Sequence, residues 1–353
     1  MNDYRFDARL ERASTLPARY YSDPQVLRAE ERNLFGRSWQ LVGRAEQVRE
    51  PGSYFTAAAA GEPLLIVRGA DGVLRAMSNV CRHRAGPVAK GEGKRPVLQC
   101  GYHGWTYGLD GRLLKTPEMT GIECFDQRSM VLPQFRVDVW NELVFVNLDP
   151  SSEPLRVFLG DLGEKLDRRG YAGYRLAARK EWFVDCNWKV YVDNYLEGYH
   201  IPIVHPGLFR EIDYPSYRTE TRRNYSIQHA PLKRPDRIRA ASPDDEAEYF
   251  WVYPNLMLNV YPDNFSTNLI VPVSHERTLT LFEWYFRDPD DPAVKDTVAF
   301  SDEIQIEDIA ICEAVQRGLR SATYTSGRYS PARENGVHHF HALYAESMGI
   351  EKV

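Results

Sequence analysis

Four side chains that bind metals well lie in two short segments of this chain. The first segment holds Cys81 and His83, and the second, after sixteen intervening residues, holds Cys100 and His103. Thiolates and imidazoles are soft or borderline ligands, and two pairs of them suit one tetrahedral metal ion or a binuclear cluster. We therefore expect a metal centre at these four residues.

The way the four ligands are paired favours an iron–sulfur cluster over zinc. Zinc sites with two cysteines and two histidines usually keep like residues together, whereas each segment here mixes one Cys with one His. In a Rieske [2Fe–2S] cluster, one iron takes both cysteines and the other takes both histidines. A structural zinc site is the alternative. The remaining cysteines, Cys124, Cys186 and Cys312, are expected to be buried apolar fillers.

A second group of candidate ligands lies more than ninety residues later. Asn194, Glu197 and His200 are spaced three residues apart, which predicts that they share one face of a helix. Pro202 disfavours continuation of that helix, so His205 can return beside His200 from a loop. Two histidines need one carboxylate to complete the triad that holds non-haem iron(II).

A late helix, predicted over residues 302–317 with Ser301 as its N-cap, offers the carboxylate. Asp308 would lie on the apolar face of that helix, where a carboxylate is costly unless it is paired or bound to a cation. Glu307 lies slightly further round and is the runner-up. Asp193 is a lesser possibility, because the helix face that carries His200 would turn it away.

Taken together, these motifs resemble those of the oxygenase (alpha) component of Rieske non-haem iron oxygenases. The resemblance is carried by Cys81-Arg82-His83-Arg84, Cys100-Gly101-Tyr102-His103-Gly104-Trp105, the segment 193–205 and Glu307-Asp308. It implies that the cluster is held by Cys81, His83, Cys100 and His103, and the mononuclear iron by His200, His205 and Asp308. Ala85 and Gly101 stand where the family often has Gly and Pro, a difference that concerns only the shape of the loops.

The resemblance also implies a role for Glu197 and a set of partners. In the family, an acidic residue at this position links a histidine of the mononuclear iron to a cluster histidine of a neighbouring subunit, here His200 and His103. Asn194 is expected to lie directly behind the iron ligands. The enzyme is expected to form homotrimers, to use dioxygen as co-substrate, and to receive electrons from a flavin and iron–sulfur reductase that oxidises NAD(P)H.

Within the family, the likeness is greatest to oxygenases of quaternary ammonium compounds, the choline monooxygenase, betaine and carnitine type. Residues 81–89, 193–200, 253–259 and 312–319 carry this likeness. Period-two alternation along a strand predicted over 253–261 places Tyr253, Asn259 and Tyr261 on one face. With Phe265 nearby, that face could form an aromatic wall for a methylated cation. The alternative is that these aromatic side chains are ordinary core.

The expected reaction is hydroxylation or oxidative N-demethylation of a small substrate, with oxygen entering a C–H bond. Hydroxylation of an aromatic ring is the alternative within the enzyme class. Outside that class, the chain could be a Rieske electron carrier without oxygenase activity. The second histidine group and the chain length both argue against an electron carrier.

Two units are needed to position these residues. Short β-rich runs with hairpin turns at Asp71-Gly72 and Asp110-Gly111 predict a small all-β domain. A helical stretch near 186–200 and a β-rich region over 248–287 predict a mixed α+β unit. We expect an N-terminal helical lead-in that packs on the catalytic domain (1–37), a Rieske domain (38–155) and a catalytic domain (156–353). The resemblance implies that the catalytic domain has a helix-grip (START-like) fold with an antiparallel sheet.

Length and composition fit an ordinary globular protein. The chain has 353 residues and a net charge of −5, so it offers no global basic field for nucleic acid. It has no apolar run long enough to span a bilayer and no signal-peptide pattern near Met1, so a cytoplasmic location is expected. Five cysteines are an odd number, which argues against a disulfide framework.

Basic residues nevertheless crowd the first pair of metal-binding segments. They are Arg82, Arg84, Lys90, Lys94 and Arg95. Either they form a docking surface for an acidic reductase, or they are the solvated charges of an ordinary loop.

Overall fold

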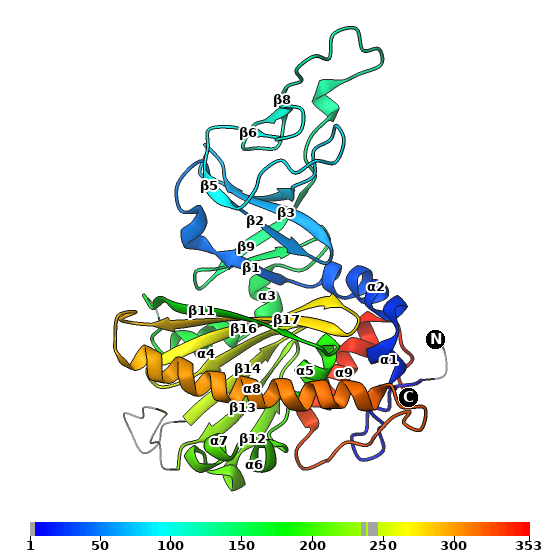
Figure 1. Cartoon of the computed structure of the whole chain (residues 1–353), viewed down its shortest axis with the longest axis vertical. Helices are drawn as coiled ribbons and strands as arrows, with labels where there is room; N and C mark the ends of the chain where they lie inside the picture. Colours follow the sequence, from blue (N-terminus) through cyan, green and yellow to red (C-terminus); the bar gives the residue numbers. More distant parts are fainter. Residues whose placement is uncertain (1–3, 172, 234–237, 239–245) are drawn as a thin grey trace. The chain divides into compact units, whose positions relative to one another are not determined.

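The computed structural model describes residues 4–171, 173–233, 238 and 246–353 of the chain. The chain divides into two compact units (Figure 1). Unit 2 is the continuous stretch 31–158, whereas unit 1 is assembled from 1–30 and 159–353. Both metal-binding segments of the first group belong to unit 2, and the second group belongs to unit 1.

Unit 2 is built mainly from antiparallel strands. One sheet has the order β1-β10-β9-β4-β3-β2-β5, and a smaller sheet has the order β6-β7-β8. The strands are β1 (Gln40–Arg44), β2 (Ser53–Ala59), β3 (Glu62–Arg68), β4 (Leu74–Ser78), β5 (Glu92–Lys94), β6 (Leu98–Gln99), β7 (Thr106–Tyr107), β8 (Leu113–Lys115), β9 (Gln134–Trp140) and β10 (Leu143–Asn147). The predicted turns at Asp71-Gly72 and Asp110-Gly111 join β3 to β4 and β7 to β8, and both glycines have positive φ.

The apolar run of β3 explains how unit 2 supports its metal-binding segments. Leu65 and Val67 pack into one buried cluster, which also contains Cys81 and Cys100, whereas the alternating residues of the same strand pack into another. Because successive side chains of a strand point to opposite faces, a continuous apolar run fits a strand that is buried on both sides. The thiols are therefore part of the hydrophobic core of unit 2.

Unit 1 contains an antiparallel sheet of order β11-β17-β16-β15-β14-β13-β12, and the long helix α8 runs along it (Figure 1). Its strands are β11 (Arg175–Val184), β12 (Arg218–Thr221), β13 (Tyr225–Pro231), β14 (Glu246–Val252), β15 (Leu256–Val260), β16 (Asn264–Ser274) and β17 (Arg277–Phe286). Its helices include α4 (Leu162–Asp167), α5 (Trp188–Tyr195), α6 (Ile201–Val204), α7 (Pro206–Glu211), α8 (Ala293–Leu319) and α9 (Asn335–Ser347). The predicted α+β class is confirmed. No helix of the described residues is long and apolar enough to cross a membrane.

The N-terminal stretch of unit 1 is tied to the rest of the unit by buried charges. It contains α1 (Arg19–Ser22) and most of α2 (Pro24–Asn33), which carries Glu30. The Glu30 carboxylate accepts hydrogen bonds from Lys189 Nζ at 2.6 Å, Trp188 Nε1 at 2.8 Å and the Tyr344 hydroxyl at 2.7 Å. Both charged side chains of the Glu30–Lys189 pair are fully buried. These bonds join α2 to α5 and α9.

The late helix begins earlier than the sequence predicts. α8 begins at Ala293, so Ser301 lies inside the helix and is not its N-cap. The carboxylate of Asp291 accepts the backbone N–H of Ala293 at 2.8 Å and thereby caps the true start. Asp302, predicted for the first turn, instead pairs with Lys180 on β11.

Two further sequence predictions are wrong in detail. α5 ends at Tyr195, so Glu197 and His200 follow the helix and do not continue its face. A side chain at Gly198 would collide with the ring of Tyr217 at 2.6 Å, which shows how closely the chain turns there. Cys124 is exposed, whereas Cys186 and Cys312 are buried as expected.

Candidate metal centres and pocket

The two metal-binding segments of unit 2 are loops with the same backbone hydrogen bonds. In the first, the N–H of Cys81 donates to the carbonyl of Gly86 and that of Ala85 to Cys81. In the second, the N–H of Cys100 donates to the carbonyl of Trp105 and that of Gly104 to Cys100. Ala85 and Gly104 occupy equivalent positions, and both have positive φ, +56° and +71°.

The four side chains of these loops are divided by type. Cys81 and Cys100 are both buried and belong to the same hydrophobic cluster. The rings of His83 and His103 lie with centroids 4.7 Å apart, and His83 stacks on Trp105. Burial raises the pKa of Cys100, against the backbone N–H groups that favour its thiolate.

This arrangement fits a Rieske cluster. Nδ1 of His83 is buried without a hydrogen-bond partner among the described residues, as expected of an atom that would bind a metal. A pair of thiols beside a pair of imidazoles matches the division of ligands between the two irons. Tyr107, to which we assigned no role from the sequence, accepts the Arg82 N–H and lies 3.2 Å from Cys81 Sγ.

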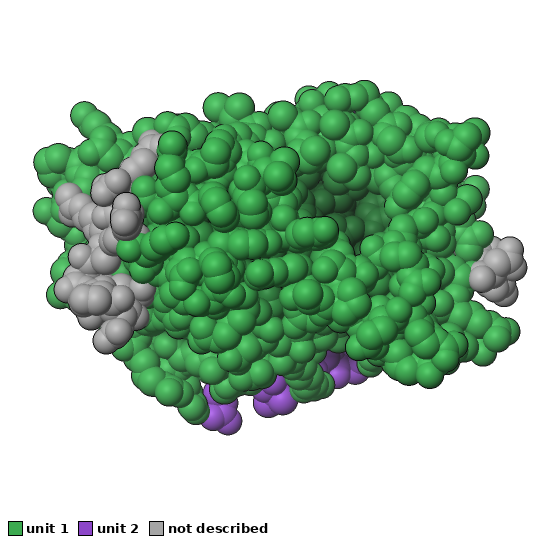
Figure 2. All heavy atoms as spheres, turned by 90° about the horizontal axis from the view of Figure 1, so that it is seen from below, with its two compact units in different colours: residues 1–30, 159–353 green, residues 31–158 purple. Residues whose placement is uncertain are grey.

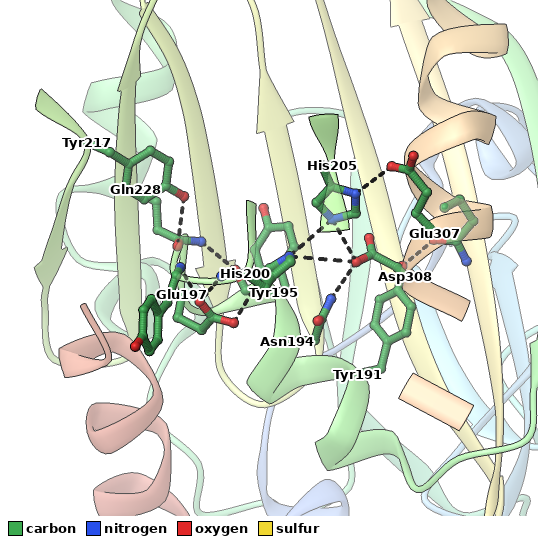
Figure 3. A network of polar contacts seen from close by, with 12 residues as sticks. Tyr191, Asn194, Tyr195, Glu197, His200, His205, Tyr217, Gln228, Glu307 and Asp308 are labelled. Carbon is green, nitrogen blue, oxygen red and sulfur yellow. Dashed lines mark hydrogen bonds and ion pairs between the residues drawn. The ribbon is translucent and has the colours of Figure 1, made fainter. Parts of the chain in front are cut away.

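In unit 1, His200 and His205 meet Asp308 at one point (Figure 3). Nε2 of His205 lies 3.1 Å from Nε2 of His200 and 3.1 Å from Oδ1 of Asp308. Nε2 of His200 lies 3.8 Å from the same oxygen. Atoms about 2.1 Å from a shared metal ion, at right angles, are separated by about 3 Å, so the three atoms have the spacing of one face of a coordination shell.

The outer nitrogens of both histidines face carboxylates. Nδ1 of His200 donates to Glu197 at 2.6 Å, and Nδ1 of His205 donates to Glu307 at 2.7 Å. With the protons on these outer nitrogens, both Nε2 atoms present lone pairs to each other and to Asp308. Three converging acceptors without a proton between them require a cation, so the donor set fits an iron(II) ion.

Glu307 and Asp308, at neighbouring positions of α8, therefore face different nitrogen atoms of the histidines. Asp308 points at the inner nitrogens and accepts the amide of Asn194 at 2.6 Å. Burial lowers the pKa of His205, but the hydrogen bonds and charges of Asp308 and Glu307 outweigh it and raise the pKa. Asp193 lies elsewhere, bonded to Tyr21 and His341.

A pocket opens beside the triad in unit 1. Its lining includes His200, His205 and Asp308 together with the aromatic side chains Tyr191, Tyr195, Tyr217, Tyr249, Tyr261, Phe282, Trp284 and Phe300. Seen from the side of α6 and α7, the surface of unit 1 is hollowed (Figure 2). An aromatic cavity next to a metal triad can hold an apolar or cationic substrate.

Two of the four residues predicted to line a substrate wall lie on this pocket. They are Asn259 and Tyr261. Tyr253 precedes β15 and bonds Ser347 on α9 at 2.6 Å, and Phe265 stacks on Tyr285 with centroids 4.7 Å apart. Neither is among the residues that line the described pocket.

Comparisons with known proteins match both parts of the chain. A family model described as the catalytic domain of the ring-hydroxylating alpha subunit matches residues 166–350, and one described as a Rieske [2Fe-2S] domain matches residues 38–126. Chloroplastic choline monooxygenase of Arabidopsis thaliana is 37% identical over 364 residues, covering 97% of this chain and 84% of that protein.

Bacterial proteins are similar over nearly their whole length. The carnitine monooxygenase oxygenase subunit of Acinetobacter pittii (strain PHEA-2) is 33% identical over 358 residues, covering 97% of this chain and 96% of that protein. A solved quaternary ammonium Rieske monooxygenase matches with a TM-score of 0.89 and 32% identity, covering 97% of this chain and 98% of that chain. The similarity thus spans both units.

Proposed function

Because this chain belongs to the Rieske non-haem iron oxygenases, we propose that it oxygenates a quaternary ammonium compound of the choline or carnitine kind. The family membership confirms the predicted oxygenase, with its [2Fe–2S] cluster, mononuclear iron and use of dioxygen. An electron carrier without oxygenase activity is thereby set aside. The observation that carries the substrate proposal is the aromatic pocket beside the His200, His205 and Asp308 triad.

We assign the two groups of ligands as follows. Cys81 and Cys100 hold one iron of the cluster, and His83 and His103 hold the other. In unit 1, the mononuclear iron is held by His200, His205 and Asp308. This assignment makes residues 38–155 the cluster domain and 156–353, with the lead-in 1–37, the catalytic part.

The bound groups supply electrons and the reductive activation of dioxygen for insertion into a substrate C–H bond. The protein's own part is to hold their ligands in place. Glu197 and Glu307 fix the tautomer of the two histidines, and Asn194 restrains Asp308. The aromatic lining shields the reacting carbon from water and presents ring faces to a methylated cation.

Electron supply requires a reductase partner, and we propose that the chain assembles as homotrimers in the cytoplasm. In this trimer Glu197 would be the link on the side of the mononuclear iron, because its Oε1 accepts the bond from His200 Nδ1. A histidine of a neighbouring copy, His103, would be its second partner. The exposed ring of His103 in unit 2 is available for such a bond.

A turnover screen tests the proposed function. The purified chain, with about three irons and two labile sulfides per chain, is combined with a generic reductase and NADH. Quaternary amines are expected to be consumed with stoichiometric oxygen uptake and product formation. Oxidation of aromatic acids alone would contradict the proposal and favour ring hydroxylation.

A further inference from the structure

One buried side chain in the pocket wall, Asn268 on β16, makes no hydrogen bond within the described part of the chain. The residue is 4% exposed and lines the pocket, and its Oδ1 is buried without a partner. Buried carboxamides in native proteins are almost always paired, because an unpaired one loses its bonds to water without replacement. The missing partner is therefore expected to come from a ligand.

Other amide side chains of the pocket are engaged within the protein. Asn259 accepts from the Tyr195 hydroxyl and donates to Ser266 Oγ, both at 3.0 Å. Gln228 accepts from the Tyr217 hydroxyl at 2.9 Å and donates to a backbone carbonyl. Asn194, Asn264 and Gln305 donate to Asp308, Asp263 and Thr280. Asn264 Oδ1 is nevertheless buried without a partner, like Asn268 Oδ1. Among these pocket amides, only the side chain of Asn268 makes neither a donor nor an acceptor bond with the described residues.

The side chains that flank Asn268 are apolar and shield it from bulk water. In the sheet it lies between Met257 on β15 and Phe282 on β17, both buried. Alternation along β16 brings Asn264, Ser266 and Asn268 to the pocket. A polar group that pairs with the amide here meets little competition from water, so the pairing discriminates strongly between substrates.

A fully methylated ammonium group has no N–H and is held by aromatic faces, so the amide must meet another part of the substrate. A neutral hydroxyl suits it, because a hydroxyl can donate to Oδ1 and accept from Nδ2. A carboxylate suits it less, because Glu197 and Asp308 on the same pocket are both acidic.

We propose that Asn268 binds the hydroxyl of a quaternary ammonium alcohol and thereby selects choline-like compounds over quaternary ammonium ions that lack a hydroxyl. This inference rests on the proposed function and names the substrate class of the same pocket. Asn268 acts in it as a specificity residue, which contacts the substrate away from the aromatic faces.

The test compares choline with propyltrimethylammonium, in which a methyl group replaces the hydroxyl. The wild-type holoenzyme is expected to prefer choline in kcat/KM by about 10-fold to 100-fold. Asn268→Leu keeps the branching and the number of side-chain heavy atoms but cannot hydrogen-bond, so the two substrates should be used about equally well, mainly because the KM for choline rises. Because the ratio is measured within each variant, general damage to the protein cancels.

Two further variants sharpen the result. Thr267→Val changes the next residue of β16, which is not part of the pocket lining, and should keep the wild-type ratio with unchanged iron content. Asn268→Asp can still accept a hydroxyl, so choline should remain a substrate, while γ-butyrobetaine, which has a carboxylate and no hydroxyl, is rejected further. A wild-type preference for γ-butyrobetaine over choline that Asn268→Asp abolishes would overturn the proposal in favour of a carboxylate.

The outcomes separate this inference from the function it rests on. If the wild-type enzyme oxidises no quaternary ammonium compound, the proposed function fails. If it oxidises them but Asn268→Leu keeps the wild-type ratio, the function stands and the role of Asn268 is refuted.

Discussion

At the scale of single residues, the adjacent carboxylates Glu307 and Asp308 of α8 contact different nitrogen atoms of the histidines. Asp308 faces the inner nitrogens of both histidines, whereas Glu307 accepts only from the outer nitrogen of His205. Their side chains are 14% and 36% exposed, in keeping with an inner and an outer role. The two positions therefore form a matched pair for substitution.

We expect Asp308→Asn to lose the mononuclear iron and all turnover, because the triad would lack its anion. Glu307→Gln should keep the site but weaken it by about 10-fold to 100-fold in iron affinity, since only the orientation of His205 is disturbed. Iron titration against labile sulfide measures both, with the cluster absorption as internal control. The reverse pattern would mean that Glu307 is the ligand.

Ala85 is a second residue whose geometry has a measurable consequence. It adopts φ +56° where the equivalent loop has Gly104 at +71°. The left-handed region costs an L residue about 1–2 kcal/mol, so Ala85→Gly should stabilise unit 2 by about 1 kcal/mol in urea unfolding followed by cluster absorption. Gly104→Ala should destabilise it similarly through its positive φ alone, because the new Cβ makes only ordinary contacts, with Pro117 at 3.5 Å and Gln99 at 3.8 Å. Equal stability of all three proteins would refute the argument.

Residue type and spacing were enough to predict which side chains the structure brings together at the two candidate metal sites, but not which ones line the pocket. Cys81, His83, Cys100 and His103 belong to short loops, so their proximity is local. Alternation placed Tyr253 beside Asn259, yet Tyr253 precedes the strand and packs against α9. Whether the Asn268 side chain finds a hydrogen-bond partner depends on the strands and helices around it. No local sequence pattern can predict that.

At the scale of elements, a buried ion pair joins α5, the helix that carries Asn194, to the N-terminal helix α2. Glu30 on α2 and Lys189 on α5 are both fully buried, and α5 also carries Asn194. Burial lowers the pKa of Lys189, although the charge and hydrogen bond of Glu30 act in the opposite direction. The pair ties the N-terminal stretch to the helix behind the triad.

Lys189→Met should destabilise unit 1 by about 3–5 kcal/mol, because it leaves the Glu30 carboxylate buried without its cation. The double variant Glu30→Gln, Lys189→Met should recover much of that loss, since no unpaired charge remains. Thermal unfolding of the iron-loaded protein measures both. A double variant no more stable than the single one would show that the charge is not the cause.

Helix boundaries illustrate why elements were harder to predict than ligands. Ser301-Asp302-Glu303 has the composition of a helix start, but α8 begins eight residues earlier, at Ala293, whose backbone N–H donates to Asp291. Asp302 forms an ion pair with Lys180, which lies more than a hundred residues earlier in the sequence. The all-β and mixed classes of the two parts, by contrast, follow from strand and helix periodicity alone.

At the scale of the whole molecule, charge is distributed unevenly. The chain carries a net charge of −5, yet Arg82, Arg84, Lys90, Lys94 and Arg95 are all exposed on unit 2. Lys94 is paired with Glu50 at 2.5 Å. A basic surface near the cluster ligands is suited to an acidic reductase.

Reduction of the cluster by its reductase should slow as ionic strength rises past about 0.1 M, where the Debye length falls below about 10 Å. Charge reversal at Lys90 and Lys94 should have the same effect at low salt. Lys295→Glu, an equally exposed change on unit 1, serves as the control and should leave the rate unchanged. If the stopped-flow reduction rate changes neither with salt nor with charge reversal at Lys90 and Lys94, these residues are ordinary surface charges.

The discontinuity of unit 1 imposes an order on biosynthesis. Since domains fold as they leave the ribosome, residues 31–158 can form their sheet while the rest of the chain is still being translated. Glu30 emerges long before Lys189 and Tyr344, so its carboxylate stays in water until the second half of unit 1 arrives. The candidate site for iron and sulfide on residues 31–158 can therefore be complete before His205 and Asp308 of the second site have been translated.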